Sequence, residues 1–404
     1  MIVFITCLSW LLSFSSLSQA ATFELQVRAN FADGFNAPPM SAFDQGTPIL
    51  DERGHVAASL LVVQGSARPG LWYGGQGHGG VVYRAPDEER VLTSLSFHSS
   101  GQIIFNQLVS SGTSDGIFRY DPATSASEKL LGAGGPLAIM SFSSVRLLGA
   151  QGSRLAFRAN DWDGNRSLVL QPLAGSPPSD APHRLASEFA ADPASPFQYL
   201  FSPEMNESGR IVAKTLDANG RDRLMEWLPD GRSVEIPIIG RAVGAGLPRI
   251  VGLDNAVALS SDGKLAFIGR LEGGARGVYL WDGNTLLEVA HTRSGGPLME
   301  IEYFAPAVNR NGRVAFRGKD AAGLQALFVG DGNRLERVIG KHDPIDSDLG
   351  PARIQQDNEH DPVFSGGVSL NDQDQLAFRA TLTPADDNRK EWGEGLYVAQ
   401  LSPQ

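Results

Sequence analysis

Short apolar runs alternate with small polar turns along most of this chain. In residues 305–320, "APAVNRNGRVAFRGKD", two apolar runs flank Asn-Arg-Asn-Gly. Gly312 can take the positive φ that a tight hairpin turn requires. The pattern therefore predicts two antiparallel strands joined by this turn, and it lacks the 3.6-residue period of a helix.

The same hairpin pattern recurs through the whole sequence. Clear copies read "SSDGKLAF", "NESGRIVA" and "NDQDQLAF", and fainter ones read "DERGHVAA", "HSSGQIIF" and "AQGSRLAF". Asp374 replaces the turn glycine in the last copy, and Asp visits left-handed conformations more readily than most residues. The anchors of the copies, each the last residue of its "VAF"-like triplet, are Ala58, Phe105, Phe157, Ala213, Phe267, Phe316 and Phe378. A spacing of about 50 residues is typical of β-propeller blades.

Each repeat has room for four strands. After the first hairpin, "GLQALFVGDGNRLERVIG" predicts a second pair of strands around Asp-Gly-Asn, and "GVYLWDGNTLLEVA" matches it in the preceding repeat. Four strands make one propeller blade. The sequence thus predicts an all-β fold, a seven-bladed β-propeller of four-stranded blades. An open β-solenoid or a pair of sandwiches is the alternative.

The two ends of the chain complement each other. The last repeat supplies a third strand, "GEGLYVAQ", and stops, whereas "TFELQVRAN" near the start is similar to the fourth strands of other repeats. A propeller hides the edges of its first and last blades by such an exchange. We therefore expect residues 23–29 to complete the C-terminal blade at residues 371–401.

These repeats resemble those of exported bacterial proteins built of tandem "NxxGxVAF" units, some of which carry membrane-anchoring tails. The resemblance rests on "NRNGRVAF", "NESGRIVA", "SSDGKLAF" and their weaker copies, and it covers most of the chain. It implies an extracytoplasmic repeat protein and brings no catalytic residues with it. Because this sequence ends at "LSPQ" directly after a strand, no cell-surface sorting tail is expected.

The first segment and the composition bear on location and partners. Residues 1–20 form an apolar run that ends in small residues, which predicts a signal peptide, with an uncleaved anchor as the alternative. Cys7, the one cysteine, lies within it, so disulfides are not expected in the remaining chain, residues 21–404, which we expect to form a single propeller domain. No further transmembrane segment is predicted, and a formal net charge of -11 argues against nucleic acid as a partner. We expect a periplasmic or secreted monomer.

Functional residues are expected on one face of the ring. The predicted glycine turns lie on one face, so the links between blades, which vary in length, lie on the other. The longest link, residues 341–364, is rich in acids. Calcium or another divalent ion is conceivable there as a cofactor, with a solvated acidic loop as the alternative. The candidate ligands are Asp343, Asp346, Asp348 and Asp357.

The links also carry residues suited to one enzymatic reaction. A His or Tyr base, with Arg neutralising a carboxylate, is what a polysaccharide lyase needs to remove the proton next to a uronate carboxyl. The candidates are His291, Arg293, Tyr303, His342, Arg353 and His360. The alternative is that these are unrelated loop residues. Sequence motifs of serine hydrolases, zinc peptidases and nucleotide-binding proteins are absent.

In the absence of a catalytic motif, a binding function is the leading prediction. The chain is expected to bind a glycan or an envelope protein on its loop-rich face, and the polysaccharide lyase is the second hypothesis. Trp162 and Trp392, predicted near loop tips, are candidates for stacking on a sugar ring, and Arg249 is a candidate ligand-binding residue.

Overall fold

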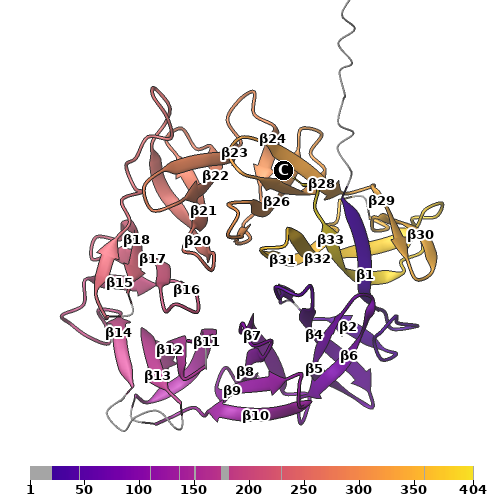
Figure 1. Cartoon of the computed structure of the whole chain (residues 1–404), viewed down its shortest axis with the longest axis horizontal. Helices are drawn as coiled ribbons and strands as arrows, with labels where there is room; N and C mark the ends of the chain where they lie inside the picture. Colours follow the sequence, from indigo (N-terminus) through magenta and orange to yellow (C-terminus); the bar gives the residue numbers. More distant parts are fainter. Residues whose placement is uncertain are drawn as a thin grey trace, which may run out of the picture.

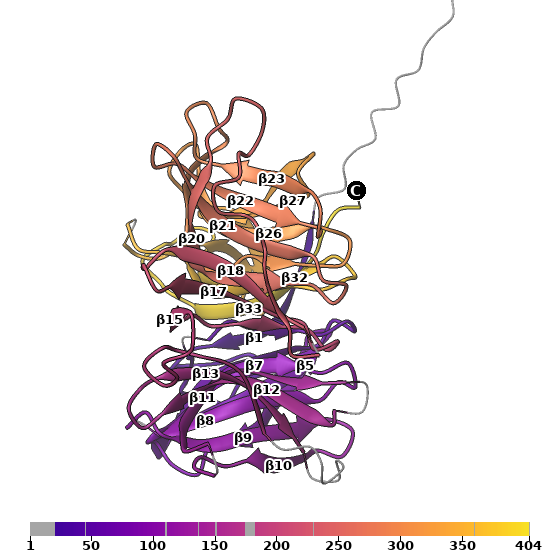
Figure 2. The same cartoon turned by 90° about the vertical axis from the view of Figure 1, so that its left-hand side faces the viewer.

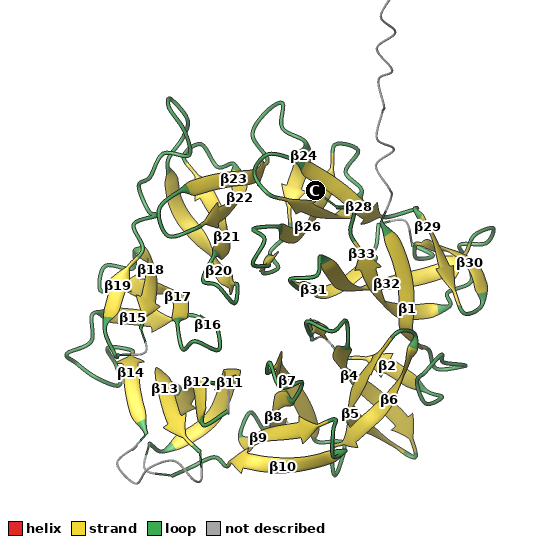
Figure 3. Ribbon diagram, in the orientation of Figure 1, coloured by secondary structure: helices red, strands yellow, loops and turns green. Residues whose placement is uncertain are grey.

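The computed structural model describes residues 21–403 except 45, 110, 136, 150–151, 174–181, 229 and 359. The predicted signal peptide lies outside the described residues. Within them the chain forms β-strands and turns without a helix, so no helix there is long and apolar enough to cross a membrane. The strands form seven sheets arranged as blades around a central axis (Figures 1 and 3). The prediction of a seven-bladed β-propeller is confirmed.

Each blade is one antiparallel sheet, and in blades 1 to 6 the strands follow one another outward from the axis in chain order. The strands of blades 1 to 3 are β2 (Ser41–Phe43), β3 (Ile49–Leu50), β4 (Val56–Gln64), β5 (Ser66–Gly75), β6 (His78–Arg84); β7 (Arg90–Phe97), β8 (Ile103–Val109), β9 (Ser114–Asp121), β10 (Ala126–Leu131); β11 (Ile139–Leu148), β12 (Arg154–Asp161), β13 (Arg166–Pro172) and β14 (His183–Ser187). Those of blades 4 to 6 are β15 (Phe197–Leu200), β16 (Glu204–Met205), β17 (Ile211–Asp217), β18 (Asp222–Trp227), β19 (Ser233–Glu235); β20 (Ile250–Leu259), β21 (Leu265–Leu271), β22 (Arg276–Trp281), β23 (Leu286–His291); β24 (Leu298–Ile301), β25 (Ala307–Val308), β26 (Val314–Asp320), β27 (Gln325–Gly330) and β28 (Leu335–Gly340).

Blade 7 contains both ends of the described chain. Its strands are β29 (Pro344–Ser347), β30 (Gly350–Ile354), β31 (Phe364–Leu370), β32 (Gln375–Pro384), β33 (Gly393–Gln400) and β1 (Thr22–Ala29). Strand β1 pairs antiparallel with β33, from Thr22 opposite Gln400 to Ala29 opposite Glu394, as Figure 1 shows. The predicted closure of the ring by the N-terminal strand is confirmed.

The first residue of the repeated turn joins neighbouring blades. The Asn309 side chain accepts a hydrogen bond from the Arg313 amide of its own turn and donates one to the Asn371 carbonyl in the next blade. Asn371 in turn donates to the carbonyl of Asp51 in blade 1. Asn206 and His98 make the same kind of contact, with the carbonyls of Ser260 and Gly149. The repeated Asn therefore serves as a clamp between blades as well as a turn residue.

The repeated turns also converge on the axis. Ser261 of blade 5 donates to the carboxylate of Asp372 in blade 7, and the amide of Ser99 in blade 2 donates to Glu207 of blade 4. Both contacts skip a blade, so these turns must lie close to the axis. We call this side the turn face, and the opposite side, formed by the links between blades and the turns between second and third strands, the loop face. Figure 2 shows the ring from the side.

The anchor residues explain why the repeat ends in an aromatic. Phe316 stacks on Phe328 of the third strand with ring centroids 5.5 Å apart, and Phe378 stacks on Tyr397 at 5.7 Å. Both anchor rings are buried. Stacked pairs of this kind add about 0.5–1.5 kcal/mol to the stabilisation from apolar burial.

The first strand is interrupted opposite the anchor in blades 1, 4 and 6, and it carries a register shift there in blades 2, 3 and 5. In blade 6, β24 pairs with β26 down to Ile301 opposite Gly318, and β25 resumes at Ala307 opposite Ala315. Because these first strands begin early, the links predicted at 29–48, 186–201 and 291–304 are shorter in the structure, whereas the one predicted at 240–252 is shifted to 236–249 because β19 ends at Glu235.

The link at 341–364 differs most from its prediction as a polar loop. It contains the hairpin of β29 and β30, and β30 pairs with β32. Ile345, Ala352 and Ile354 of this hairpin pack into the core of blade 7. Their apolar side chains among the acids are what convert the link into part of the sheet.

Candidate ligand-binding site

Side chains bridge adjacent blades at the interruptions of the first strands. Lys214 of blade 4 donates to the carbonyl of Leu253 in blade 5 at 2.9 Å. Arg276 of blade 5 donates to the Ile301 carbonyl in blade 6, and Arg317 of blade 6 donates to the Gly366 carbonyl in blade 7. At each of these places a main-chain carbonyl lacks a hydrogen bond within its own sheet, and a side chain of the neighbouring blade donates one to it.

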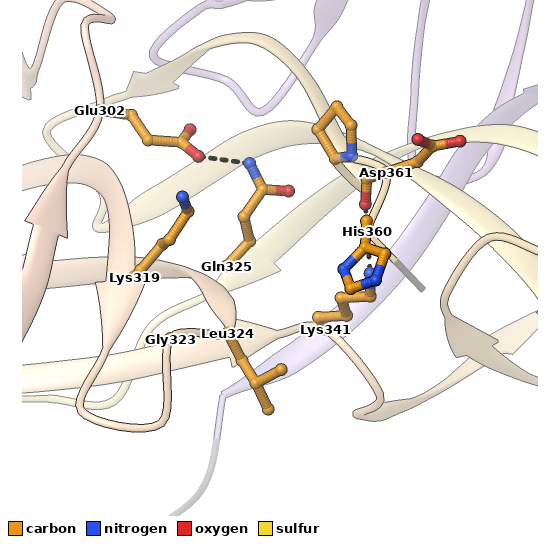
Figure 4. A pocket seen from close by; sticks show the side chains of 9 residues that line it. Glu302, Lys319, Gly323, Leu324, Gln325, Lys341, His360 and Asp361 are labelled. Atoms are coloured by element: carbon orange, nitrogen blue, oxygen red, sulfur yellow. Dashed lines mark hydrogen bonds between the residues drawn. The ribbon is translucent and has the colours of Figure 1, made fainter. Parts of the chain in front are cut away.

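A pocket of about 410 Å³ opens on the loop face between blade 6 and the link into blade 7 (Figure 4). The interruption between β24 and β25, the end of β26, the turn into β27 and the two ends of the link all contribute to it. Its lining residues are Glu302, Lys319, Gly323, Leu324, Gln325, Lys341, His360, Asp361 and Pro362. This volume lies within the range of about 300–1,000 Å³ that is usual for small-molecule sites.

One side of the pocket is lined by the carboxylate of Glu302, which two hydrogen bonds hold in place. Glu302 accepts from the Arg317 guanidinium at 2.7 Å and from the Gln325 amide. Burial lowers the pKa of Arg317, and the nearby Glu302 opposes that shift. The Gln325 oxygen accepts from the Val363 amide at 2.7 Å, which ties this wall to blade 7. The arrangement holds an acceptor and an amide in defined positions, as Figure 4 shows.

Two lysines supply donors to the pocket. Lys341 is only 5% exposed, and its ammonium donates to the Asp361 carbonyl at 3.1 Å. Lys319 forms an ion pair with Glu300 at 2.6 Å, and this hydrogen bond raises the lysine pKa. The Lys319 ammonium is therefore present as a cation at neutral pH.

The chemical character of the pocket is mixed. The carboxylates of Glu302 and Asp361 accept hydrogen bonds, the two lysines donate them, and Leu324 and Pro362 add apolar surface. Alternating donors and acceptors beside small apolar patches suit a ligand rich in hydroxyl groups.

The six residues predicted for a lyase are found in separate environments. Arg293 forms a bidentate ion pair with Glu288, and His291 lies 3.8 Å from the same carboxylate. The Tyr303 ring instead lies over Arg276, with 3.9 Å from guanidinium carbon to ring centroid.

The other three candidates lie in the link into blade 7. His360 lines the pocket. Arg353 donates to the carbonyls of Ala385 and His342, and the backbone of His342 bonds to Ile354. Arg353 and His342 are thus joined through a main-chain carbonyl, while His291 and Arg293 approach the same carboxylate, that of Glu288.

The aspartates proposed as metal ligands mostly have structural partners. Asp343 binds Arg337 at 2.6 Å, Asp348 binds Arg28 at 2.7 Å, and Asp346 accepts from the Tyr397 hydroxyl through its main-chain carbonyl. Asp357 is exposed. In the part of the chain that the structure describes, no three His, Cys, Asp or Glu side chains gather as a metal site. Ion pairs within the protein thus engage two of the four candidate ligands, Asp343 and Asp348.

The predicted binding residues are also dispersed. Trp162 is 62% exposed at the tip between β12 and β13. Trp392 packs against the core of blade 7, and its carbonyl accepts from Arg28. Arg249 donates to the Gly240 carbonyl at 2.6 Å within its own link.

The sequence predictions named only His360 among the pocket residues. The first residue of the third strand is charged in blades 3, 4 and 5 but neutral in blade 6, where it is Gln325. It is also neutral in blades 1, 2 and 7. This position therefore does not single out blade 6, and the repeat pattern carries no signal for the other lining residues.

Comparison with known proteins supports the architecture. No family model matches the sequence, and the search of curated proteins finds no relative. The β-propeller domain of the Trilobed protease from Pyrococcus furiosus aligns with a TM-score of 0.51 and 13% identity over 88% of this chain and 97% of that domain. A puromycin-hydrolyzing peptidase of Mycobacterium tuberculosis aligns with a TM-score of 0.51 and 13% identity over 87% of this chain. This chain spans about half of that peptidase, 52% of its length.

A structure from a study of two prolyl endopeptidases gives a TM-score of 0.52 at 12% identity, over 88% of this chain and 50% of that one. At such low identity these similarities establish the fold alone. The protein belongs to the structural class of seven-bladed β-propellers.

Proposed function

We propose that this protein is exported and binds a saccharide in the pocket between blades 6 and 7. The observation that carries the proposal is the lining of the pocket of about 410 Å³, to which blade 6 contributes Lys319, Glu302 and Gln325 and the link into blade 7 contributes Lys341 and Asp361. Sugar hydroxyls both donate and accept hydrogen bonds, so each of these groups has a partner on such a ligand. The tandem-repeat resemblance supports an extracytoplasmic location for this binding.

The binding proposal is tested with the purified protein on an array of neutral and acidic glycans, followed by calorimetry on the ligands that bind. Lys319→Met removes one donor from the pocket and is expected to weaken binding about tenfold, as loss of a charged hydrogen bond does. Arg270→Met is the matched control, because Arg270 occupies the same position in β21 of blade 5 and pairs with Asp222 instead. Equal losses in the two variants would count against the pocket, and binding of envelope proteins in place of any glycan would reject the saccharide.

The export proposal has its own test. Cleavage of the predicted signal peptide after Ala20 would leave Ala21 as the first residue. N-terminal sequencing of protein recovered outside the cytoplasm is expected to begin there. Recovery of the uncleaved chain in the membrane fraction would instead support an anchor.

A further inference from the structure

The charged side chains that blade 6 contributes to the pocket are matched by opposite charges within the protein. Lys319 pairs with Glu300, its nitrogen 2.6 Å from a carboxylate oxygen. This hydrogen bond is the main cause of the raised lysine pKa, and the charges of Glu300 and Glu302 add to it. Glu302 in turn pairs with the guanidinium of Arg317 at 2.7 Å. Two cations and two carboxylates thus balance one another on this side of the pocket.

The link into blade 7 contributes one charge of each sign. Lys341 is 5% exposed, and its ammonium donates to the Asp361 carbonyl, as Figure 4 shows. The Asp361 carboxylate accepts from the side-chain amide of Asn358 at 3.0 Å. The lining residues of the pocket therefore include two lysines and two acids, Glu302 and Asp361.

This balance of charges disfavours an anionic ligand. A uronate carboxylate would leave water for a pocket that already holds the carboxylates of Glu302 and Asp361, and it would compete with Glu300 for the Lys319 ammonium. Removing a charge from water is costly unless an opposite charge pairs with it. A sugar hydroxyl does not incur this cost, and it can bond to an ammonium or to a carboxylate.

We propose that the pocket selects uncharged saccharides over acidic ones, and that the ion pair between Lys319 and Glu300 is the main determinant of this selectivity. The inference rests on the proposed saccharide function and narrows its ligand class. Glu300 acts through Lys319 as a positioning residue. It holds the ammonium, which still has hydrogens to donate to a sugar hydroxyl, and it supplies the negative charge that an acidic ligand would otherwise bring.

A second ion pair offers a matched control. The side chains of Arg223 and Glu235 in blade 4 are 36% and 42% exposed, the same fractions as those of Lys319 and Glu300. Neither Arg223 nor Glu235 lines the pocket. Glu235→Gln therefore removes one negative charge from an equally exposed pair outside the pocket, whereas Glu300→Gln removes one at the pocket itself.

The experiment compares ligands that differ mainly in charge. The probes are short oligogalacturonides with their methyl esters, and cello-oligosaccharides with their uronate forms. Because His360 also lines the pocket, calorimetry is done at about pH 7.5, above the usual pKa of an imidazole. The wild type is expected to bind the neutral member of each pair about tenfold more tightly or better. Glu300→Gln should reduce this preference about tenfold, and Glu235→Gln should leave it at the wild-type value.

The outcomes separate this inference from the proposal beneath it. If the wild type binds the acidic members as tightly as the neutral ones, the selectivity is rejected while saccharide binding stands. If Glu300→Gln keeps the wild-type preference, the role of the ion pair is rejected. A general loosening of the pocket would weaken both members of a pair, so it would not change their ratio. Failure of every probe to bind, with the fold confirmed by circular dichroism, would reject saccharide binding by these sugar types and the selectivity with it.

Discussion

The side-chain amide of Asn309 donates a hydrogen bond to the main-chain carbonyl of Asn371, its counterpart in the next repeat, at 3.0 Å. Asn371 continues the series by donating to Asp51 at 2.8 Å, across the junction where the ring closes. In a single hairpin this Asn would serve only to form the turn. Here it also links each of these blades to the next.

Replacing this clamp should destabilise the ring. Asn309 is buried, so Asn309→Ala leaves the Arg313 amide without its acceptor and removes one of the donors to the Asn371 carbonyl. We expect a loss of about 1–3 kcal/mol in the free energy of unfolding. Urea denaturation followed by tryptophan fluorescence measures it. Asn333→Ala in an exposed turn is the control and should change stability by less than about 0.5 kcal/mol.

A second prediction concerns ring closure. Arg28 of β1 is 1% exposed, bonds to both oxygens of Asp348 and donates to the Trp392 carbonyl. Arg28→Met would leave the Asp348 carboxylate, itself 15% exposed, without its cation. A loss of about 3–5 kcal/mol is expected from such a change.

The readouts are the denaturation midpoint and the protease sensitivity of the N-terminal strand. Arg232→Met, which breaks the exposed pair with Asp230, serves as the control and should have almost no effect. If the N-terminal strand of the Arg28→Met variant resists proteolysis as well as that of the wild type, backbone pairing with β33 is enough to close the ring.

The third prediction is a pH dependence. Asp217 accepts from the amides of Arg221 and Asn219 and from the Arg223 guanidinium, and these bonds lower its pKa. Because the pKa is lower in the folded state, the ionised carboxylate contributes stability above its unfolded value of about 3.9, and this is lost as pH falls through the folded pKa.

Asp217→Asn keeps an acceptor oxygen but not the charge. The stability difference between wild type and this variant should therefore be constant from pH 7 to 5 and shrink below about pH 4. Denaturation midpoints across this range test it. A difference that stays the same down to pH 3 would show that the carboxylate charge is not involved.

The fourth prediction concerns catalysis. Tyr303 lies over Arg276, His291 lies beside Glu288 and His360 lines the pocket, so each of these groups has a different neighbour, and we expect no lyase activity. Incubation with acidic polysaccharides should produce no absorbance from unsaturated uronates. A rising absorbance that His360→Ala abolishes would overturn this and identify the pocket as catalytic.

Much of the fold is encoded locally and was predictable. The turn glycine Gly312 has φ of +83°, and Asp374, which replaces glycine in the last repeat, has +56°. Turn chemistry of this kind and the alternation of apolar positions depend only on neighbouring residues, so they are visible in the sequence. The complementary first and last repeats likewise identified the closing strand.

The candidate site was less predictable because it depends on contacts between distant residues. The sequence marked the link at 341–364 as a place for function, and His360 does line the pocket. The sequence did not show that Asp348 would form an ion pair with Arg28, because 320 residues separate the two along the chain. The sequence of an acidic loop does not distinguish carboxylates that bind a metal from those that pair with an arginine or face solvent.

The sequence by itself determined the repeat, the turn geometry and the strand that closes the ring, because each follows from short-range pattern. Only the tertiary structure decided that Glu302, Lys341 and His360 share one pocket and that Tyr303 lies over Arg276 of the neighbouring blade. The interruption in the first strand of blade 6 and the path of the link into blade 7 set those positions. Both arise from packing between blades, which a single repeat does not encode.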